Sequence, residues 1–242
     1  MSRSERRARA RHRSRRDRVE EARPRTRRQR FSPVQLAGVS VLAVVGVLVL
    51  IWLGTVSAQG PATTLPPAIT QNGHARGPAN APVTIEEWAD FQCPACGQFA
   101  RIVAPQLLST YVAKGQVQIV FHHMAFLGQE SSWAAEAAEC AGEQGKFFEY
   151  HDKLYASQAG ENRGAFSKDN LKRFGTEIGL APSFAACVDS GRYAQAVRDD
   201  TKAGEGRGVT ATPTLFINGR KIEGVPSFDQ LKAIIDPLLL GR

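Results

Sequence analysis

The spacing of hydrophobic residues changes several times along the chain, and each spacing predicts a different element. The segment from Val34 to Leu53 carries no charged residue, and about 20 apolar residues are enough for a helix to cross a membrane. From Val83 to Phe91 the alternation predicts a buried strand, and between Cys93 and Lys114 apolar residues recur at helical spacing. The pattern therefore predicts a membrane span followed by an α/β domain.

The rest of the domain continues this alternation of strands and helices. A second strand is predicted at 116–122, followed by helices within 131–157, from Ser167, and over 182–189 and 192–206. Strands at 214–218 and 220–224 flank Asn218-Gly219, which is typical of a type I′ hairpin turn. A helix over 228–239, capped by Ser227, completes the domain. Helices between strands predict an α/β sheet, here with a helical insertion at about 128–206.

Charge is distributed very unevenly along the chain. The protein carries a formal net charge of +8, yet residues 1–30 hold 14 arginines and only four acidic residues, so the remainder is slightly acidic. We expect residues 1–33 to form a disordered tail, because they contain too little apolar surface to offset the entropy of ordering. Anionic lipid and membrane topology account for the arginines, so no nucleic-acid binding is expected. The alternative is a tail that binds nucleic acid.

Positive residues flanking a first span stay in the cytoplasm. We therefore expect residues 34–53 to be a single transmembrane helix with the N-terminus inside the cell. The segment 54–73 is rich in proline and threonine and is predicted to be an extended linker. The catalytic domain, residues 74–242, would then lie outside the cytoplasm on the cell membrane. The alternative is a cleaved signal peptide, although its apolar core is normally shorter than this one.

Cys93-Pro94-Ala95-Cys96 follows the first predicted strand and opens a helix. A C-x-x-C in this position is typical of a redox pair, and alone it would also fit half a zinc site. A zinc site needs about four ligands, and the chain has no second C-x-x-C, so no metal is expected there. The helix N-terminus should lower the pKa of Cys93, which makes it the attacking thiolate, whereas Cys96 suits the resolving role. Pro94 fits the first helical turn.

The segments 81–85 and 90–96, together with Thr212-Pro213-Thr214, resemble the DsbA-like thioredoxin family in its membrane-anchored form. The resemblance implies a thioredoxin-like fold with a cis peptide before Pro213, which faces the sulfurs. It also implies that Thr212 pairs with a substrate strand beside Pro94 and Ala95. Glu87 matches the buried acid that exchanges a proton with the second cysteine, and Glu86 should face outward. Without the resemblance, Pro213 could mark an edge strand and Glu87 an ordinary strand-edge carboxylate.

The remaining cysteines and histidines favour structural roles. Cys140 and Cys187 are left over in an oxidising compartment, where such residues usually pair, and members of the family carry a structural disulfide in this subdomain. The alternative is two buried free thiols. His122 and His123 are expected to be surface or satisfied core histidines. Ala95 stands where the strongest oxidants of the family carry histidine, so we expect a weaker oxidant.

These features together predict a thiol–disulfide oxidoreductase that oxidises exported proteins bearing free thiols through the Cys93–Cys96 disulfide. No cofactor is expected, and the family implies reoxidation by a quinone-linked membrane partner. One alternative is a reductase or isomerase on the same fold. Another is a redox-inactive binding module, against which the intact C-x-x-C argues.

Overall fold

The computed structural model describes residues 71–241. The predicted tail at 1–33, the predicted membrane span at 34–53 and most of the predicted linker lie outside the described residues. Among the described helices, none has both the length and the apolar character needed to traverse a bilayer.

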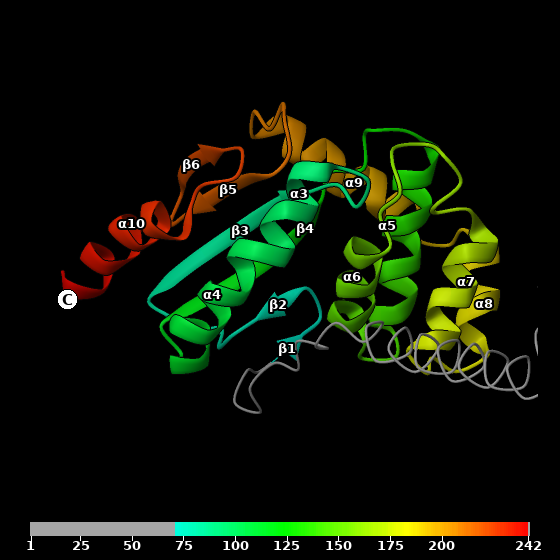
Figure 1. Ribbon diagram of the computed structural model, residues 1–242, viewed down its shortest axis with the longest axis horizontal. Helices are drawn as coiled ribbons and strands as arrows, with labels where there is room; N and C mark the ends of the chain where they lie inside the picture. The colour runs from blue at the N-terminus through cyan, green and yellow to red at the C-terminus, as the bar shows by residue number, and fades with distance from the viewer. Residues whose placement is uncertain (1–70, 242) are drawn as a thin grey trace, which may run out of the picture. The chain divides into compact units, whose positions relative to one another are not determined.

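A mixed sheet of six strands forms the centre of the described region (Figure 1). The strand order is β1-β2-β4-β3-β5-β6. The strands are β1 (Gln71–Asn72), β2 (Ala75–Arg76), β3 (Val83–Ala89), β4 (Val117–His123), β5 (Thr214–Ile217) and β6 (Arg220–Glu223). β3 and β4 are parallel, whereas the other neighbouring strands are antiparallel. The predicted β5–β6 hairpin is confirmed, and Asn218 and Gly219 both have the positive φ that a type I′ turn requires.

The hairpin of β1 and β2 was not predicted from the sequence. β1 lies entirely within the predicted linker at 54–73, so the ordered domain begins before His74, its predicted start. Strands of two residues are too short to show an alternation of apolar and polar positions, which is why the pattern missed them.

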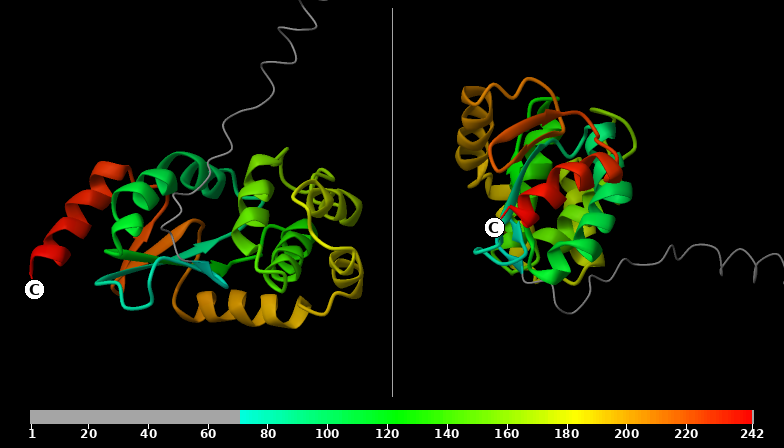
Figure 2. Two further views of the ribbon diagram at one scale, coloured as in Figure 1. Left: turned by 90° about the horizontal axis from the view of Figure 1, so that it is seen from below. Right: turned by 90° about the vertical axis from the view of Figure 1, so that its left-hand side faces the viewer.

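Helices cover both faces of the sheet (Figure 2). On one face lie α3 (Pro94–Gln98), α4 (Ala104–Thr110) and α10 (Phe228–Leu240), where Leu107 and Ile235 share a buried cluster with Ile85 of β3. The helix α9 (Ala194–Gly206) lies on the other face, against Trp88. Alternate residues of β3 thus point to opposite faces, and Glu87 shares the face of Ile85.

The helix predicted over 93–114 is not continuous. A π-helical segment, Phe99–Val103, separates α3 from α4, and a 3₁₀ turn, Val112–Lys114, follows α4. The backbone N–H of Ala104 donates to the carbonyl of Phe99 five residues earlier. The next residue, Pro105, has no N–H to donate to the preceding turn, so the regular α-helical hydrogen bonding is interrupted here.

The helical insertion between β4 and β5 is confirmed. It consists of α5 (Gln129–Gly142), α6 (Phe147–Ala156), α7 (Lys168–Glu177), α8 (Ser183–Ser190) and α9. A disulfide joins Cys140 of α5 to Cys187 of α8, as expected. Both cysteines are buried among apolar residues of the insertion. The bridge therefore fixes two helices of the insertion to each other.

Removing this disulfide in a Cys140→Ala/Cys187→Ala variant is expected to lower the free energy of unfolding by about 4 kcal/mol. The physical reason is that the bridge closes a loop across a sequence separation of 47 and so restricts the unfolded chain. Denaturant unfolding would measure the loss, with Cys93 and Cys96 held in the same redox state in both proteins. A loss well below about 1 kcal/mol would show that the bridge does not constrain the unfolded chain.

Candidate active site

Cys93 lies at the junction between the sheet and helix α3. It is the N-cap residue of α3, and Pro94 occupies the first helical turn. The Cys93 thiol lies 3.3 Å from the carbonyl oxygen of Thr212, to which it donates a hydrogen bond. The peptide bond between Thr212 and Pro213 is cis, as expected. Two segments far apart in the sequence therefore meet at this sulfur.

The two cysteines have opposite electrostatic environments. A hydrogen bond from the Cys96 thiol is the largest cause that lowers the pKa of Cys93 to about 6, and backbone N–H groups of Ala95 and Cys96 add to it. Cys96 is fully buried, and this burial raises its pKa well above the ordinary range. Near neutral pH the reduced pair therefore carries its negative charge on Cys93, which is the more exposed of the two sulfurs.

The loop that leads into Cys93 is held by the buried carboxylate of Asp90. One of its oxygens accepts hydrogen bonds from the Ser131 hydroxyl at 2.7 Å and the Gln92 backbone N–H at 2.8 Å. The other accepts from the backbone N–H groups of Phe126 and Leu127, both at 3.1 Å. Asp90 therefore links the end of β3 to the start of the helical insertion, and burial raises its pKa.

Gln158 holds the same loop from the end of α6. Its side-chain amide donates to the backbone carbonyls of Phe91 and Cys93, at 2.8 and 2.9 Å. Its amide oxygen occupies the space beside Gly97, where an added Cβ would lie only 2.1 Å away. Neither Asp90 nor Gln158 was predicted to have a role at this site. Asp90 lies in the resembling segment, whereas Gln158 follows its helix with no motif around it.

Glu87 is a buried acid on the same face of the sheet as Ile85. Burial raises its pKa to about 8, against the opposing charge of Arg76. Its Oε1 has no hydrogen-bond partner within residues 71–241. Burial raises the pKa of the Tyr155 hydroxyl well above its ordinary range, and the charges of Cys96 and Glu87 add to this effect. Glu87 thus shares a buried polar region with the second cysteine.

The neighbouring Glu86 is half-buried rather than fully exposed. It forms an ion pair with Arg207 at 2.5 Å. His122 stacks on Trp88 and lies 3.2 Å from Asp200, and His123 is buried beside Glu139. Both histidines therefore have structural partners.

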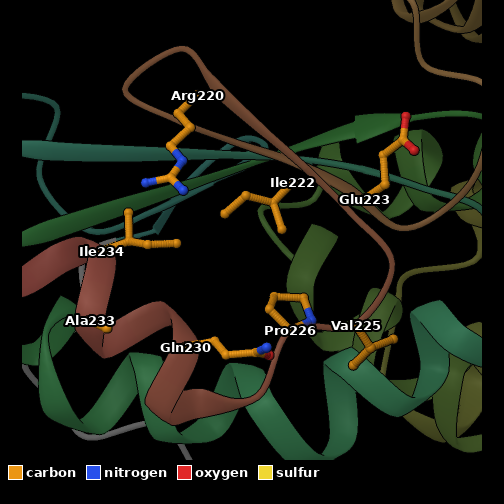
Figure 3. Close-up of a pocket in the computed structure, with 8 residues that line it drawn as sticks. All are labelled: Arg220, Ile222, Glu223, Val225, Pro226, Gln230, Ala233 and Ile234. Carbon is orange, nitrogen blue, oxygen red and sulfur yellow. The ribbon is translucent and has the colours of Figure 1, made fainter.

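A hollow of about 470 Å³ lies elsewhere, between β6 and α10 (Figure 3). Ile222 of the strand faces Ala233 and Ile234 of the helix across it. Neither cysteine is among its lining residues, so the hollow is separate from the candidate active site.

Residues 69–237 match the thioredoxin family, and this segment includes Cys93, Cys96 and Pro213. A probable disulfide bond formation protein D of Bacillus anthracis is 30% identical over 170 residues, which cover 66% of this chain and 75% of the relative. The chain belongs to the DsbA-like thioredoxin family.

Two further proteins similar to this DsbA-like chain differ from each other in how much of their own length it covers. The crystal structure of oxidised BdbD from Bacillus subtilis superposes with a TM-score of 0.65 at 26% identity, covering 69% of this chain and 93% of that one. The Na⁺/H⁺ antiporter NhaA 3 of Salinispora tropica is 36% identical over 182 residues. The match covers 74% of this chain but only 26% of the antiporter. The chain therefore spans about a quarter of the antiporter it matches.

Alkylation of the reduced DsbA-like chain by iodoacetamide is expected to reach half its maximal rate near pH 6, because only the Cys93 thiolate reacts. A Cys96→Ala variant should move this midpoint to higher pH, because it removes the hydrogen bond that lowers the pKa most. Mass spectrometry would assign the alkylated cysteine, and Cys93→Ala is the control that loses the reaction. A wild-type midpoint near 9 would contradict the assignment.

Replacing Glu87 by glutamine is expected to stabilise the protein at pH 8 by roughly 1–4 kcal/mol, with little effect at or below pH 4.5. In the folded protein the Glu87 carboxyl keeps its proton up to about pH 8, whereas the ordinary pKa of a glutamate carboxyl is 4.5. Between these values the folded state binds more protons than the unfolded state, so stability falls as pH rises.

Denaturant unfolding at several pH values would measure this effect. Glu86→Gln is the matched control, because it removes the adjacent carboxylate, which is half-buried and paired with Arg207. This control should show no gain at pH 8. Parallel pH profiles for wild type and Glu87→Gln would disprove the buried, protonated state of Glu87.

Proposed function

We propose that this chain is a thiol–disulfide oxidoreductase that oxidises the cysteines of exported proteins through a Cys93–Cys96 disulfide. The observation that carries the proposal is the asymmetry of the pair. The pKa of Cys93 is lowered to about 6 beside the cis peptide of Pro213, whereas that of Cys96 is raised by burial. A thiol with a low pKa is a good leaving group, so Cys93 is readily released from a mixed disulfide with a substrate.

The reaction follows from the positions of the two sulfurs. A substrate thiolate attacks Cys93 Sγ, the Cys93–Cys96 bond breaks, and Cys96 leaves as a thiolate that takes up a proton because of its raised pKa. Glu87, which holds a proton up to about pH 8, is the proposed donor. A second substrate thiolate then attacks the substrate sulfur of the mixed disulfide and releases Cys93 as a thiolate. The substrate loses two electrons, which the cysteine pair gains.

Substrate would lie along the segment that precedes Pro213. The Thr212 carbonyl already accepts a hydrogen bond from the Cys93 thiol, so it lies beside the sulfur that a substrate must reach. We propose that the backbone of Thr212 pairs with an extended substrate segment, and that Pro94 and Ala95 contact the same segment. Backbone pairing of this kind recognises many sequences, as a general oxidase requires.

The location of the reaction is part of the same proposal. The uncharged run at 34–53 and the arginines before it favour a membrane anchor with the N-terminus in the cytoplasm and residues 74–242 outside. The Cys140–Cys187 disulfide accords with an oxidising compartment. A quinone-linked membrane partner is proposed as the oxidant that regenerates the Cys93–Cys96 disulfide.

The reduction potential of the Cys93–Cys96 pair tests the direction of the reaction. In the full-length chain, equilibrated with glutathione buffers, we expect a potential between about −120 and −180 mV, the range of disulfide donors. Peptide mapping would follow Cys140 and Cys187 separately. A value near about −270 mV would instead identify a reductase.

Activity of a Cys93→Ser variant separates catalysis from simple binding. We expect this variant to lose oxidation of a reduced, unfolded substrate completely, because no sulfur remains to form the mixed disulfide. If wild type and variant alike bound the unfolded substrate and neither oxidised it, the chain would be a redox-inactive binding module.

A further inference from the structure

Two histidines and a glutamate from three separate elements converge away from the cysteine pair. His74 lies in the turn between β1 and β2, His123 is the last residue of β4, and Glu139 belongs to α5. The Nε2 atoms of His74 and His123 lie 2.9 and 2.7 Å from the same oxygen of Glu139. One potential ligand atom from each residue falls within 4.8 Å of the other two.

We propose that His74, His123 and Glu139 bind a divalent transition-metal ion, with Zn²⁺ as the best-suited physiological candidate. Two imidazole nitrogens and one carboxylate oxygen are a donor set that zinc uses when it keeps a further position open for water. The same set does not suit Ca²⁺, which prefers six to eight oxygen ligands. The proposal is independent of the proposed redox function, because neither Cys93 nor Cys96 takes part.

The charge of the cluster suits a cation. The Glu139 carboxylate lies between two imidazole nitrogens, so one acidic group and two nitrogen donors face the same point. A metal bound to both Nε2 atoms would take the place of the N–H protons that these atoms now direct at Glu139, and each neutral imidazole would then carry its proton on Nδ1. Two neutral imidazoles and one carboxylate offset only one of the two positive charges of a divalent ion. The remaining positive charge favours a water or hydroxide ligand on the ion.

Aromatic rings pack around the cluster, and His74 is its most exposed member. His74 stacks on Phe147 with ring centroids 4.2 Å apart, and His123 packs edge-on against both His74 and Phe121. The His123 side chain is 2% exposed, whereas that of His74 is 32% exposed. A metal ion can therefore reach the cluster past His74, and the aromatic rings restrict the reorientation of the ligands.

A metal at this position would connect three parts of the fold that are distant in sequence. It would bind the N-terminal hairpin through His74, the central sheet through His123 and the helical insertion through Glu139. We therefore expect metal binding to stabilise the folded chain, because an ion that binds only the folded state shifts the unfolding equilibrium.

Zinc titration of the full-length chain tests the proposal. The protein would first be oxidised, so that Cys93 and Cys96 form a disulfide and cannot bind zinc as thiolates. Competition with a chromophoric chelator should then show one zinc ion per chain, and zinc should raise the thermal midpoint. Glu139→Gln and His74→Ala should each weaken binding by about tenfold or more and abolish the rise.

His122→Ala is the matched control, since His122 adjoins His123 in sequence but pairs with Asp200 instead. This variant should bind zinc as wild type does. His74→Ala changes a partly exposed turn residue, and circular dichroism would establish that it folds. Equal zinc affinity in wild type, Glu139→Gln and His74→Ala would overturn the proposal, as would an equal response to Ca²⁺. Failure of the wild-type chain to bind zinc would leave a hydrogen-bonded cluster only.

Discussion

The carboxylate of Asp90 organises the region around the cysteine pair. It is buried where β3 ends, and its four hydrogen bonds reach the loop before Cys93, the segment after β4 and the first turn of α5. A buried carboxylate is costly unless every such bond is made. Asp90 therefore holds β3, the loop before α3 and the start of the helical insertion together. The low pKa of Cys93 depends on α3, which begins at this point.

Much of the fold could be predicted from the sequence because its patterns of apolar and polar residues extend over many positions. Three predicted features depend only on residues that are close together in the sequence. They are the alternation in β3, the helical spacing of apolar residues in the insertion, and the Asn218-Gly219 turn. The β1–β2 hairpin and the π-helical segment were missed for different reasons. Two-residue strands show no period, and the π-helical turn depends on how Pro105 alters hydrogen bonding one turn earlier.

The residues of the active site could likewise be predicted only where they belong to a local pattern in the sequence. Cys93, Cys96 and the cis peptide at Pro213 belong to short motifs, so their residues stand out in the chain. Gln158 and the cluster of His74, His123 and Glu139 do not, because their members come together only through the tertiary fold. The burial of Glu87 could be anticipated from strand parity, but the size of its pKa shift depends on how completely α6 and its neighbours exclude water.

The close approach of Gly97 and Gln158 has a consequence for how this sequence can change. Any side chain at position 97 would displace the amide that holds the carbonyls of Phe91 and Cys93. The flexible Gln158 side chain can move aside for a larger residue at position 97, but it would then lose its hydrogen bonds to these two carbonyls. The choice of residue at position 97 is consequently constrained by a side chain about 60 positions further along the chain.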